Sequence, residues 1–386
     1  MTQQLSAVRY TADFVPCQAS PVAELGSFGL VNEYEDPDCK VYVDDPERRF
    51  LRVLSPQWEN VRNIDLDDQY QQYARRAAEF PTGNWRPLFH MQTWMKKNPD
   101  VFNKFRPNII CSSRALRQAL DIPNTCGHRT FNESFVACKR RGIIYLTCAK
   151  FDLPDDRRPV NYQKSYRLHR FEQLVTRGAG TEVDDFSSFE YFYSVIGRTI
   201  GDTRVLYSQK VDSVNPRLAR TTSPENYMSL LFTEDKAAAP HDNRCTWKHQ
   251  NAERSLWSKC FVSGSPRVLV GRKRDNLLIN CAMTEVARIP DSATTQKFIL
   301  LCGSRHRNCQ HWNKERNVSF LNDFLKFVRN TVQQDYERSA YGFIVDFSNR
   351  STATVRATEW CAGSADFEAN NILRKWDQVE AASAVV

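Results

Sequence analysis

Several features that would place a chain in a special class of protein are missing from this sequence. No apolar run approaches the roughly 18 residues that a membrane-spanning helix requires. The opening segment Met1–Tyr10 is polar and has no apolar stretch of the kind found in secretory signals, so we expect none. There is no internal repeat and no long low-complexity linker, and the 14 glycines and 17 prolines are dispersed. This favours one continuous domain over residues 1–375, followed by a flexible tail over residues 376–386.

Cysteine is present, but not in a pattern that suggests a disulfide framework. The 12 cysteines are scattered along 386 residues, and no secretory signal is expected. Reduced thiols in a nuclear or cytosolic protein are therefore predicted, and we favour the nucleus. One short stretch combines thiols with imidazoles, at Cys302, His306, Cys309 and His311. Its spacing matches no common zinc finger, so we expect a polar loop there rather than a metal site.

The overall composition is that of a folded protein with a positive charge. Hydrophobic residues make up 41% of the chain and aromatic residues 12%, which is enough to form a buried core. Lysine and arginine number 53 against 45 aspartates and glutamates, a formal net charge of +8. Such a charge permits an anionic partner such as RNA, although many other soluble domains have a similar one.

Local patterns predict helices and strands in an irregular order. In Asp65–Phe80 acidic residues come first and arginines later, which suits the dipole of a helix. Phe320, Phe324, Leu325, Phe327, Val328 and Val332 recur at helical spacing and predict an amphipathic helix. Segments rich in β-branched and aromatic residues predict strands at Gly142–Phe151, Arg204–Ser213, Asn226–Phe232 and Arg267–Gly271. Without a regular βαβ alternation, the predicted class is α+β with mixed sheets.

The strand predicted at Arg204–Ser213 carries charged residues near its end. Lys210 and Asp212 are two residues apart, so on a regular strand both side chains project from one face. In metal-dependent nucleases, carboxylates at such positions share a cation that activates water and stabilises phosphoryl oxygens. An E-x-D strand followed by an E-x-K strand is one such arrangement.

This region and several others resemble the DXO family of decapping and deNADding exoribonucleases. Leu206–Pro216 (LYSQKVDSVNP) and Tyr227–Phe232 (YMSLLF) are similar to the two metal-site strands of that family. Further similar segments follow in the family's order: ELGSFGL (24–30), RRGIIYL (140–146), HRFEQLV (169–175), LWSKCFVSGSPRVLVGRKR (256–274) and FLNDFLKFVRNTVQQD (320–335). The resemblance implies a fold of two twisted mixed β-sheets flanked by helices.

The departures from the family pattern concern the residues that carry its chemistry. Glu172 matches a family glutamate, while Arg167 stands where a glycine is usual. Of the E-x-D pair only Asp212 remains, because Lys210 replaces the glutamate. In the second strand, Ser229 stands where the family has the E-x-K glutamate, and Leu231 where it has the lysine. Lys259 replaces a substrate-side glutamine. Ser113 falls at the position of a phosphate-binding arginine, with Arg114 one place away. Two of four family carboxylates survive.

Lys210 is the departure with the greatest consequence. It places an ammonium where a divalent ion would be held, and a contact at about 4 Å is worth about 4 kcal/mol per charge product at an effective dielectric near 20. We therefore predict that Lys210 lies within ion-pair reach of Glu172 or Asp212 and takes the place of metal charge. In the alternative, Lys210 extends to solvent and the pocket has simply decayed.

Basic clusters elsewhere supply candidate RNA contacts. Two short runs lie beside predicted strands, at Lys139, Arg140 and Arg141 and at Arg272, Lys273 and Arg274. Together with Arg114 they could bind phosphate, or the runs could assist nuclear import. The alternative is that they are solvated turns.

The predicted function is that of a non-catalytic nuclear RNA-pathway protein with a vestigial pocket formed by Glu172, Lys210, Asp212, Ser229, Leu231 and Lys259. No catalytic residue, cofactor or metal is assigned to it. Among degenerate members of the DXO family, the resemblance is to those of the germline piRNA pathway. It implies binding of RNA 5′ ends or of a Rhino–Deadlock-type chromatin complex, and protection of nascent transcripts from 5′-end processing, splicing and termination. Two alternatives stay open: an active decapping or 5′-end hydrolase with a rearranged site, and a scaffold without RNA contact.

Overall fold

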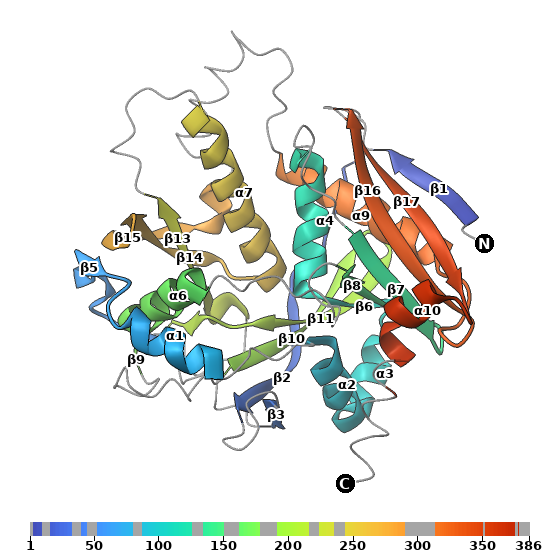
Figure 1. The fold of residues 1–386 in the computed structure, drawn as a ribbon, viewed down its shortest axis with the longest axis horizontal. Coiled ribbons are helices and arrows are strands. Elements are labelled where there is room, and N and C mark those ends of the chain that lie inside the picture. Colours follow the sequence, from blue (N-terminus) through green and yellow to red (C-terminus); the bar gives the residue numbers. More distant parts are fainter. Residues whose placement is uncertain are drawn as a thin grey trace.

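The structure is a computed structural model that describes most of the chain, arranged around two β-sheets (Figure 1). The described residues are 3–9, 16–32, 40–44, 52–79, 87–125, 134–149, 162–177, 191–215, 224–234, 244–289, 313–349, 352–374 and 377. The stretch from Cys302 to His311 lies outside these ranges. Among the helices of the described ranges, none is long and apolar enough to cross a membrane.

The first sheet has ten strands among the described residues, and it is mixed. Its central strand β6 runs parallel to both neighbours, β8 and β11, while the other pairs are antiparallel. In spatial order the strands are β1 (Gln3–Arg9), β17 (Thr352–Cys361), β16 (Ser339–Asn349), β7 (Ser134–Arg140), β8 (Ile143–Cys148), β6 (Ile109–Ser112), β11 (Thr203–Lys210), β10 (Tyr191–Ile200), β2 (Ala23–Asn32) and β3 (Lys40–Val43).

The second sheet is smaller, with seven strands in the described part of the chain. It is also mixed, because β13 runs parallel to β14 and β12 parallel to β4. In spatial order the strands are β5 (Ile64–Asp65), β15 (Leu277–Glu285), β14 (Arg267–Arg274), β13 (Tyr227–Glu234), β12 (Ser213–Val214), β4 (Val53–Leu54) and β9 (Thr176–Arg177). The predicted fold, an α+β class with two mixed sheets, is confirmed.

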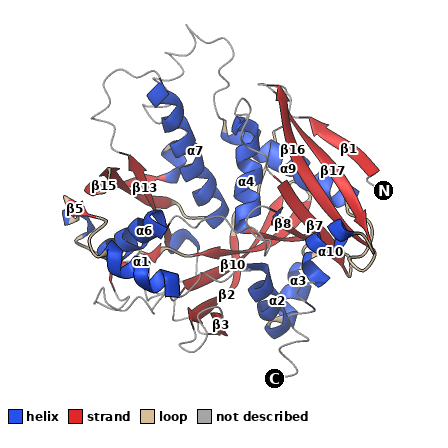
Figure 2. Ribbon diagram, in the orientation of Figure 1, coloured by secondary structure: helices blue, strands red, loops and turns tan. Residues whose placement is uncertain are grey.

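Helices flank both sheets (Figure 2). Residues of α4, α7 and α9 pack in one hydrophobic cluster with the first sheet, and residues of α2, α3 and α10 pack in a second cluster with it. Helices α1 and α6 lie beside the second sheet (Figure 1). The bounds are α1 (Tyr70–Glu79), α2 (Pro87–Lys97), α3 (Pro99–Phe105), α4 (Ser113–Thr125), α6 (Tyr162–Val175), α7 (Arg244–Ser263), α9 (Lys314–Thr331) and α10 (Ala365–Asn370), with 3-10 turns η2 (Trp58–Asn60), η3 (Pro224–Asn226) and η4 (Val286–Arg288).

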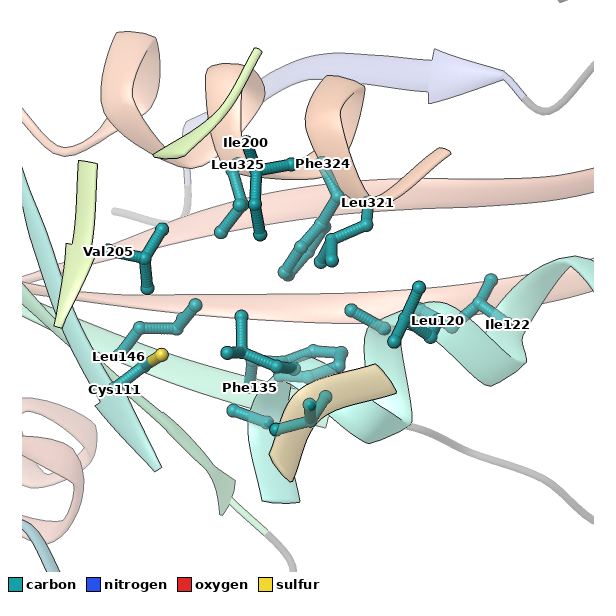
Figure 3. Packing of buried hydrophobic residues seen from close by; sticks show 14 of the residues in the cluster. Cys111, Leu120, Ile122, Phe135, Leu146, Ile200, Val205, Leu321, Phe324 and Leu325 are labelled. Atoms are coloured by element: carbon teal, nitrogen blue, oxygen red, sulfur yellow. The ribbon is translucent and has the colours of Figure 1, made fainter. Parts of the chain in front are cut away.

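Helix α9 packs its apolar face onto the larger hydrophobic cluster, with Leu321, Phe324 and Leu325 pointing into it (Figure 3). Phe324 lies 4.8 Å from Phe135 of β7 and 6.2 Å from Phe343 of β16, measured between ring centroids. All six residues of the predicted apolar stripe are buried, at 7% exposure or less. The side chain of Asn313 caps the helix by accepting a hydrogen bond from the backbone N–H of Arg316, at 2.8 Å. The amphipathic helix predicted from sequence is confirmed.

Three strand predictions are confirmed with small changes in their bounds, at β8, β13 and β14. The helix predicted from Asp65 starts only at Tyr70, because Asp65 belongs to β5 and the next residues form a turn. In that turn the carboxylate of Asp65 accepts a hydrogen bond from the backbone N–H of Asp67, so the acidic residues stabilise the turn instead of the helix. Seven cysteines whose side chains the structure describes have free thiols, namely Cys17, Cys111, Cys138, Cys148, Cys260, Cys281 and Cys361.

The strand predicted at Arg204–Ser213 is in fact two strands in different sheets. Strand β11 of the first sheet ends at Lys210, and β12 of the second sheet starts at Ser213. Val211 and Asp212 connect them, so the chain passes from one sheet to the other at this point. The assumption that Lys210 and Asp212 share a face of one strand was therefore wrong, since Asp212 lies beyond the end of β11.

Candidate functional site

The vestigial pocket predicted from sequence lies where the chain passes between the two sheets. Helix α6 supplies Glu172, the end of β11 supplies Lys210, and the connection to β12 supplies Asp212. Helix α7 supplies Lys259, and β13 passes beside it with Ser229 and Leu231. Both carboxylates are closed off from solvent, with Glu172 2% and Asp212 5% exposed. Buried carboxylates need partners, because burial strongly disfavours an isolated charge.

Glu172 is neutralised by two cations from separate parts of the chain. The Nζ of Lys210 donates to both of its carboxylate oxygens, at 3.0 and 3.1 Å. Arg52, which precedes β4, donates to Oε2 through Nη1. The predicted ion pair between Lys210 and Glu172 is thus confirmed, and the solvated arrangement of Lys210 is not observed.

Asp212 has a different cation and a backbone partner. The Nζ of Lys259 forms an ion pair with Oδ2 and also donates to the carbonyl oxygen of Leu230, at 3.1 Å. The same Oδ2 accepts a hydrogen bond from the backbone N–H of Leu230, at 3.0 Å. Lys210 lies between the two carboxylates, since its Nζ is also 3.9 Å from Oδ1 of Asp212. A continuous network of three cations and two anions results, which we call the pocket network (Arg52, Glu172, Lys210, Asp212 and Lys259).

The pKa of Glu172 follows from this arrangement. Burial on its own would raise the pKa, but Lys210, His169 and Arg52 together hold it well below its usual range. His169 lies one helical turn earlier on α6, with Nδ1 3.7 Å from Oε2 of Glu172. Burial lowers the pKa of His169, and the attraction of Glu172 only partly opposes that shift. The carboxylate therefore stays ionised over the physiological range.

The two neutral members of the predicted pocket cannot supply charge. Ser229 is buried, and its hydroxyl oxygen lies 3.5 Å from that of Ser263 on α7. Leu231 packs against the large hydrophobic cluster. The strand that carries them is present as predicted, but neither side chain brings a carboxylate to the pocket.

A small cavity adjoins the pocket network. Its volume is about 10 Å³, which is room for roughly one water molecule. Buried polar atoms without a hydrogen-bond partner, the hydroxyl of Ser194 and Oε1 of Gln209, belong to residues that line it. The lining residues are Ser194, Gln209, Lys210, Val211, Asp212, Tyr227, Met228, Ser229, Ser263 and Ser265. A nucleotide would not fit in this space without movement of the side chains.

The pocket network does not match the needs of a divalent ion. Mg²⁺ and Ca²⁺ are held by oxygen atoms that supply negative charge. Here Lys210 and Lys259 already use the carboxylate oxygens of Glu172 and Asp212. Within the described part of the chain, no group of three or more His, Cys, Asp or Glu residues is arranged to hold a metal. The arrangement instead carries one net positive charge, from three cations against two anions.

The basic clusters lie in different places. Arg114 is exposed at the first turn of α4, one residue after Ser113. Arg272, Lys273 and Arg274 end β14 in the second sheet, and the Nζ of Lys273 donates to the carbonyl of Asp275 at 3.1 Å. Lys139, Arg140 and Arg141 lie at the turn from β7 to β8 in the first sheet. The two basic runs thus belong to different sheets, whereas Arg114 follows β6, whose Ser112 pairs with Ser208 of β11, two residues before Lys210.

Sequence reasoning missed Arg52 and the pairing of Lys259. Arg52 lies 120 residues before Glu172 in the chain, and no spacing rule connects them. Its ring neighbour is Tyr191, whose centroid is 6.0 Å from the guanidinium carbon. Arg167, noted as a departure, lies outside the network and pairs with Asp67, with Nε 2.6 Å from Oδ1. That pair ties α6 to the turn before α1, which positions Glu172 indirectly.

Comparison with known proteins places this geometry in a family. A model of the RAI1-like PD-(D/E)XK nuclease family matches residues 23–378. The chain belongs to the RAI1-like PD-(D/E)XK nuclease family. The decapping and exoribonuclease protein of Bos taurus is 24% identical over 336 residues, which cover 83% of this chain and 77% of the relative. That of Rattus norvegicus is 26% identical over 337 residues, with the same coverage of each chain.

Solved structures of RAI1-like proteins share the fold. The crystal structure of Candida albicans Rai1 in complex with pU5-Mn²⁺ superposes with a TM-score of 0.65 at 15% identity, and covers 95% of each chain. Scheffersomyces stipitis Rai1, solved with (3′-NADP)⁺ and calcium, gives a TM-score of 0.63 at 14% identity, covering 94% of this chain and 96% of that one. The mixed α+β architecture with two curled sheets is therefore that of this decapping exoribonuclease family.

Proposed function

We propose that this RAI1-like chain is a non-catalytic, Cutoff-like nuclear protein that binds RNA 5′ ends or protein partners without cleaving RNA. The observation that carries the proposal is the pocket network, in which lysine ammonium groups form ion pairs with both buried carboxylates. Metal-assisted hydrolysis needs a cation that can activate water and stabilise phosphoryl oxygens. An ammonium supplies a fixed charge, but it cannot lower the pKa of a bound water as a divalent ion does.

The charge balance supports RNA contact over a scaffold without RNA. A scaffold role would be favoured by a neutral or acidic pocket, whereas Arg52, Lys210 and Lys259 outnumber Glu172 and Asp212. Since the cavity holds about one water, an RNA end would contact the rim instead of entering fully. Binding of this kind depends on phosphate charge and not on a metal.

The first test is a cleavage assay. Purified protein with Mg²⁺ or Mn²⁺ is incubated with capped, NAD-capped, triphosphorylated and 5′-monophosphorylated RNA, with the rat decapping and exoribonuclease protein as an active control. We expect no release of cap, NAD or pyrophosphate, and no degradation. Turnover that disappears in Glu172→Ala or Asp212→Ala would instead establish an active hydrolase with a rearranged site.

Binding is tested separately from cleavage. We expect the protein to bind 5′-phosphorylated single-stranded RNA more tightly than its 5′-hydroxyl form, equally well in EDTA and in Mn²⁺. Equal affinity for the two ends would exclude recognition of the 5′ phosphate. Affinity that depends on Mn²⁺ would show that the pocket still takes a metal.

The cellular part of the proposal concerns germline chromatin. A Cutoff-like protein of the piRNA pathway would associate with a Rhino–Deadlock-type complex and protect nascent transcripts from 5′-end processing, splicing and termination. Pull-down from germline nuclei is expected to recover such a complex. Recovery of no chromatin, transcription or RNA-processing factor would contradict this assignment.

A further inference from the structure

The basic turn between β7 and β8 is covered by a carboxylate from the C-terminal segment. The guanidinium of Arg140 forms an ion pair with Asp377, and its Nη2 donates to the hydroxyl oxygen of Tyr336 at 2.8 Å. The Tyr336 hydroxyl in turn donates to Oδ2 of Asp377 at 2.8 Å. The guanidinium carbon of Arg140 also lies 4.4 Å from the centroid of the Tyr336 ring. Asp377 thus accepts hydrogen bonds from Arg140 and from Tyr336, and Arg140 in turn lies over the ring of Tyr336.

The C-terminal segment is anchored unevenly. Phe367, Ile372 and Leu373 are buried in the hydrophobic cluster of the first sheet, and the side chain of Asn371 donates to the carbonyl of Tyr336 at 2.6 Å. Asp377 lies beyond this anchor, and its side chain is 38% exposed. Solvent-exposed ion pairs contribute little to stability, so Asp377 can leave Arg140 at a small cost. The tail predicted over residues 376–386 therefore includes one docked residue, and the other residues of that range lie outside the described structure.

The surface beneath Asp377 has the chemistry of a single-strand RNA contact. Arginine binds phosphate through two parallel hydrogen bonds, and Arg140 is held in place over the Tyr336 ring, which itself packs against the hydrophobic cluster of the first sheet. Two more cations flank the pair: Lys139, whose Nζ donates to the carbonyl of Gln333 at 3.2 Å, and Arg141, which is exposed at the turn. The carboxylate of Asp377 occupies the position where a phosphate oxygen would bind the guanidinium.

We propose that Arg140 and Tyr336, with Lys139 and Arg141, form a second RNA-binding site for the phosphate backbone of single-stranded RNA, and that Asp377 covers it as a competing carboxylate. Binding exchanges one anion for another on the same guanidinium. RNA displaces the carboxylate, and Arg140, which lies over the Tyr336 ring, then pairs with a phosphate. The site recognises internal nucleotides, since nothing in it selects a 5′ end.

This site is distinct from the pocket network. Strands β8 and β6 separate β7 from β11, and Figure 1 shows β7 and α10 on the opposite side of the molecule from α6 and β13. The inference rests on the proposed RNA-binding function but not on the pocket. A failure of 5′-end recognition would leave it intact, and its own failure would leave the pocket proposal intact.

The test is RNA affinity in variants that release Asp377. The probe is a labelled 5′-hydroxyl oligouridylate of about ten nucleotides, and the readout is fluorescence anisotropy over a range of salt concentrations. Asp377→Asn should tighten binding about three- to tenfold and steepen the dependence of log Kd on log salt by about 0.7, the value for one added phosphate contact on a single strand. Tyr336→Phe should also tighten binding, because it removes a hydrogen bond to Asp377 without changing the net charge.

Matched controls separate release of Asp377 from a general charge effect. Glu368 lies on the same C-terminal segment and pairs with Arg374 at 2.6 Å, away from Arg140. Glu368→Gln should leave affinity nearly unchanged, and Arg140→Gln should cancel the gain of Asp377→Asn. The proposal is overturned if Asp377→Asn binds RNA no better, or if Glu368→Gln improves binding equally. It is also overturned if Asp377→Asn changes only the capture of a protein partner, because the turn would then be a protein contact. A 5′-phosphorylated copy of the probe should show the same gain.

Discussion

The hydrophobic residues packed around helix α9 and the two carboxylates of the pocket network are both buried, but they are stabilised by opposite means. Around α9, aromatic and aliphatic side chains from β7, β16 and the helix pack without charge. In the pocket network, each of the two buried carboxylates forms an ion pair with at least one lysine or arginine. These ion pairs connect α6, β11, α7 and the segment before β4. Apolar burial tolerates many sequences of similar volume. A buried ion network tolerates few, because removal of one member leaves another charge without a partner.

The comparison suggests a reason why the pocket keeps its charges. An enzyme of this family would balance its carboxylates with metal ions, which come from solution. Here the balancing charges for Glu172 and Asp212 are arginine and lysine side chains of the chain itself. Variants of the two regions, from the largest expected effect to the smallest, show whether each region is stabilised in its own way.

The largest loss of stability is expected from the α9 core. Phe324→Ala should lower the free energy of unfolding by about 3–5 kcal/mol, since it removes a fully buried ring and leaves a cavity between Phe135 and Phe343. Lys326→Ala, at an exposed position of the same helix, is the control and should change stability by less than about 0.5 kcal/mol. Urea unfolding measures both. Similar values for the two variants would mean that α9 is not packed as described.

A charge reversal in the pocket network should have the next largest effect. Lys210→Glu adds a third carboxylate beside Glu172 and removes a cation, so we expect a loss of about 2–4 kcal/mol without metal. This loss is somewhat smaller than the roughly 3–5 kcal/mol typical of a broken buried ion pair, because the Lys210 side chain is 21% exposed. The measurement is a urea or thermal melt in EDTA. A Lys210→Glu variant as stable as the parent would show that the lysine is only a solvated side chain.

A double variant asks whether metal can replace the lysine. Lys210→Glu together with Ser229→Glu should recreate weak binding of divalent ions, because it restores the carboxylates that the family pattern has at these positions. Mn²⁺ should then raise the melting temperature of the double variant, since a ligand that binds only the folded state stabilises it. The parent protein serves as the control and should show no such shift. Equal shifts in the two proteins would point to a metal site elsewhere.

The pH dependence of stability tests the pocket network in another way. The folded-state pKa of Glu172 is held below its usual range, near 4.3 in an unfolded chain. Its contribution is therefore fully present above that value and is lost as the pH falls through the folded pKa. Wild-type stability should decline below about pH 4 more steeply than that of Glu172→Gln. Urea unfolding at a series of pH values provides the comparison, and parallel curves for the two proteins would rule out this contribution.

The smallest effect is expected from an ion pair outside both regions. Arg356 and Asp346 pair across β17 and β16 on the surface, with side chains 50% and 33% exposed. Arg356→Ala should cost less than about 1 kcal/mol, because solvent and salt screen such pairs. A loss as large as that of Lys210→Glu would mean that exposure does not distinguish the pocket network from a surface ion pair.

Much of the fold was accessible from the sequence because its signals are local. The apolar stripe of α9, the β-branched runs of β8 and β14 and the apolar run of β13 are local patterns of this kind. The limits of this reasoning appear at residues 203–214, where one apparent strand is two strands in different sheets. Alternation of side chains continued across the break, so nothing in the pattern marked the change of sheet.

The candidate site was partly accessible for a different reason. The order of family-like segments indicated Glu172, Lys210, Asp212 and Lys259, and the opposite charges of Lys210 and the carboxylates suggested a pair. The sequence by itself therefore indicated four members of the pocket, but not the helices α6 and α7 that carry Glu172 and Lys259. Only the tertiary structure decided that Arg52 joins Glu172 and that Lys259 pairs with Asp212. Contacts between residues 120 and 47 positions apart depend on how the two sheets and α7 pack, and no local propensity encodes that.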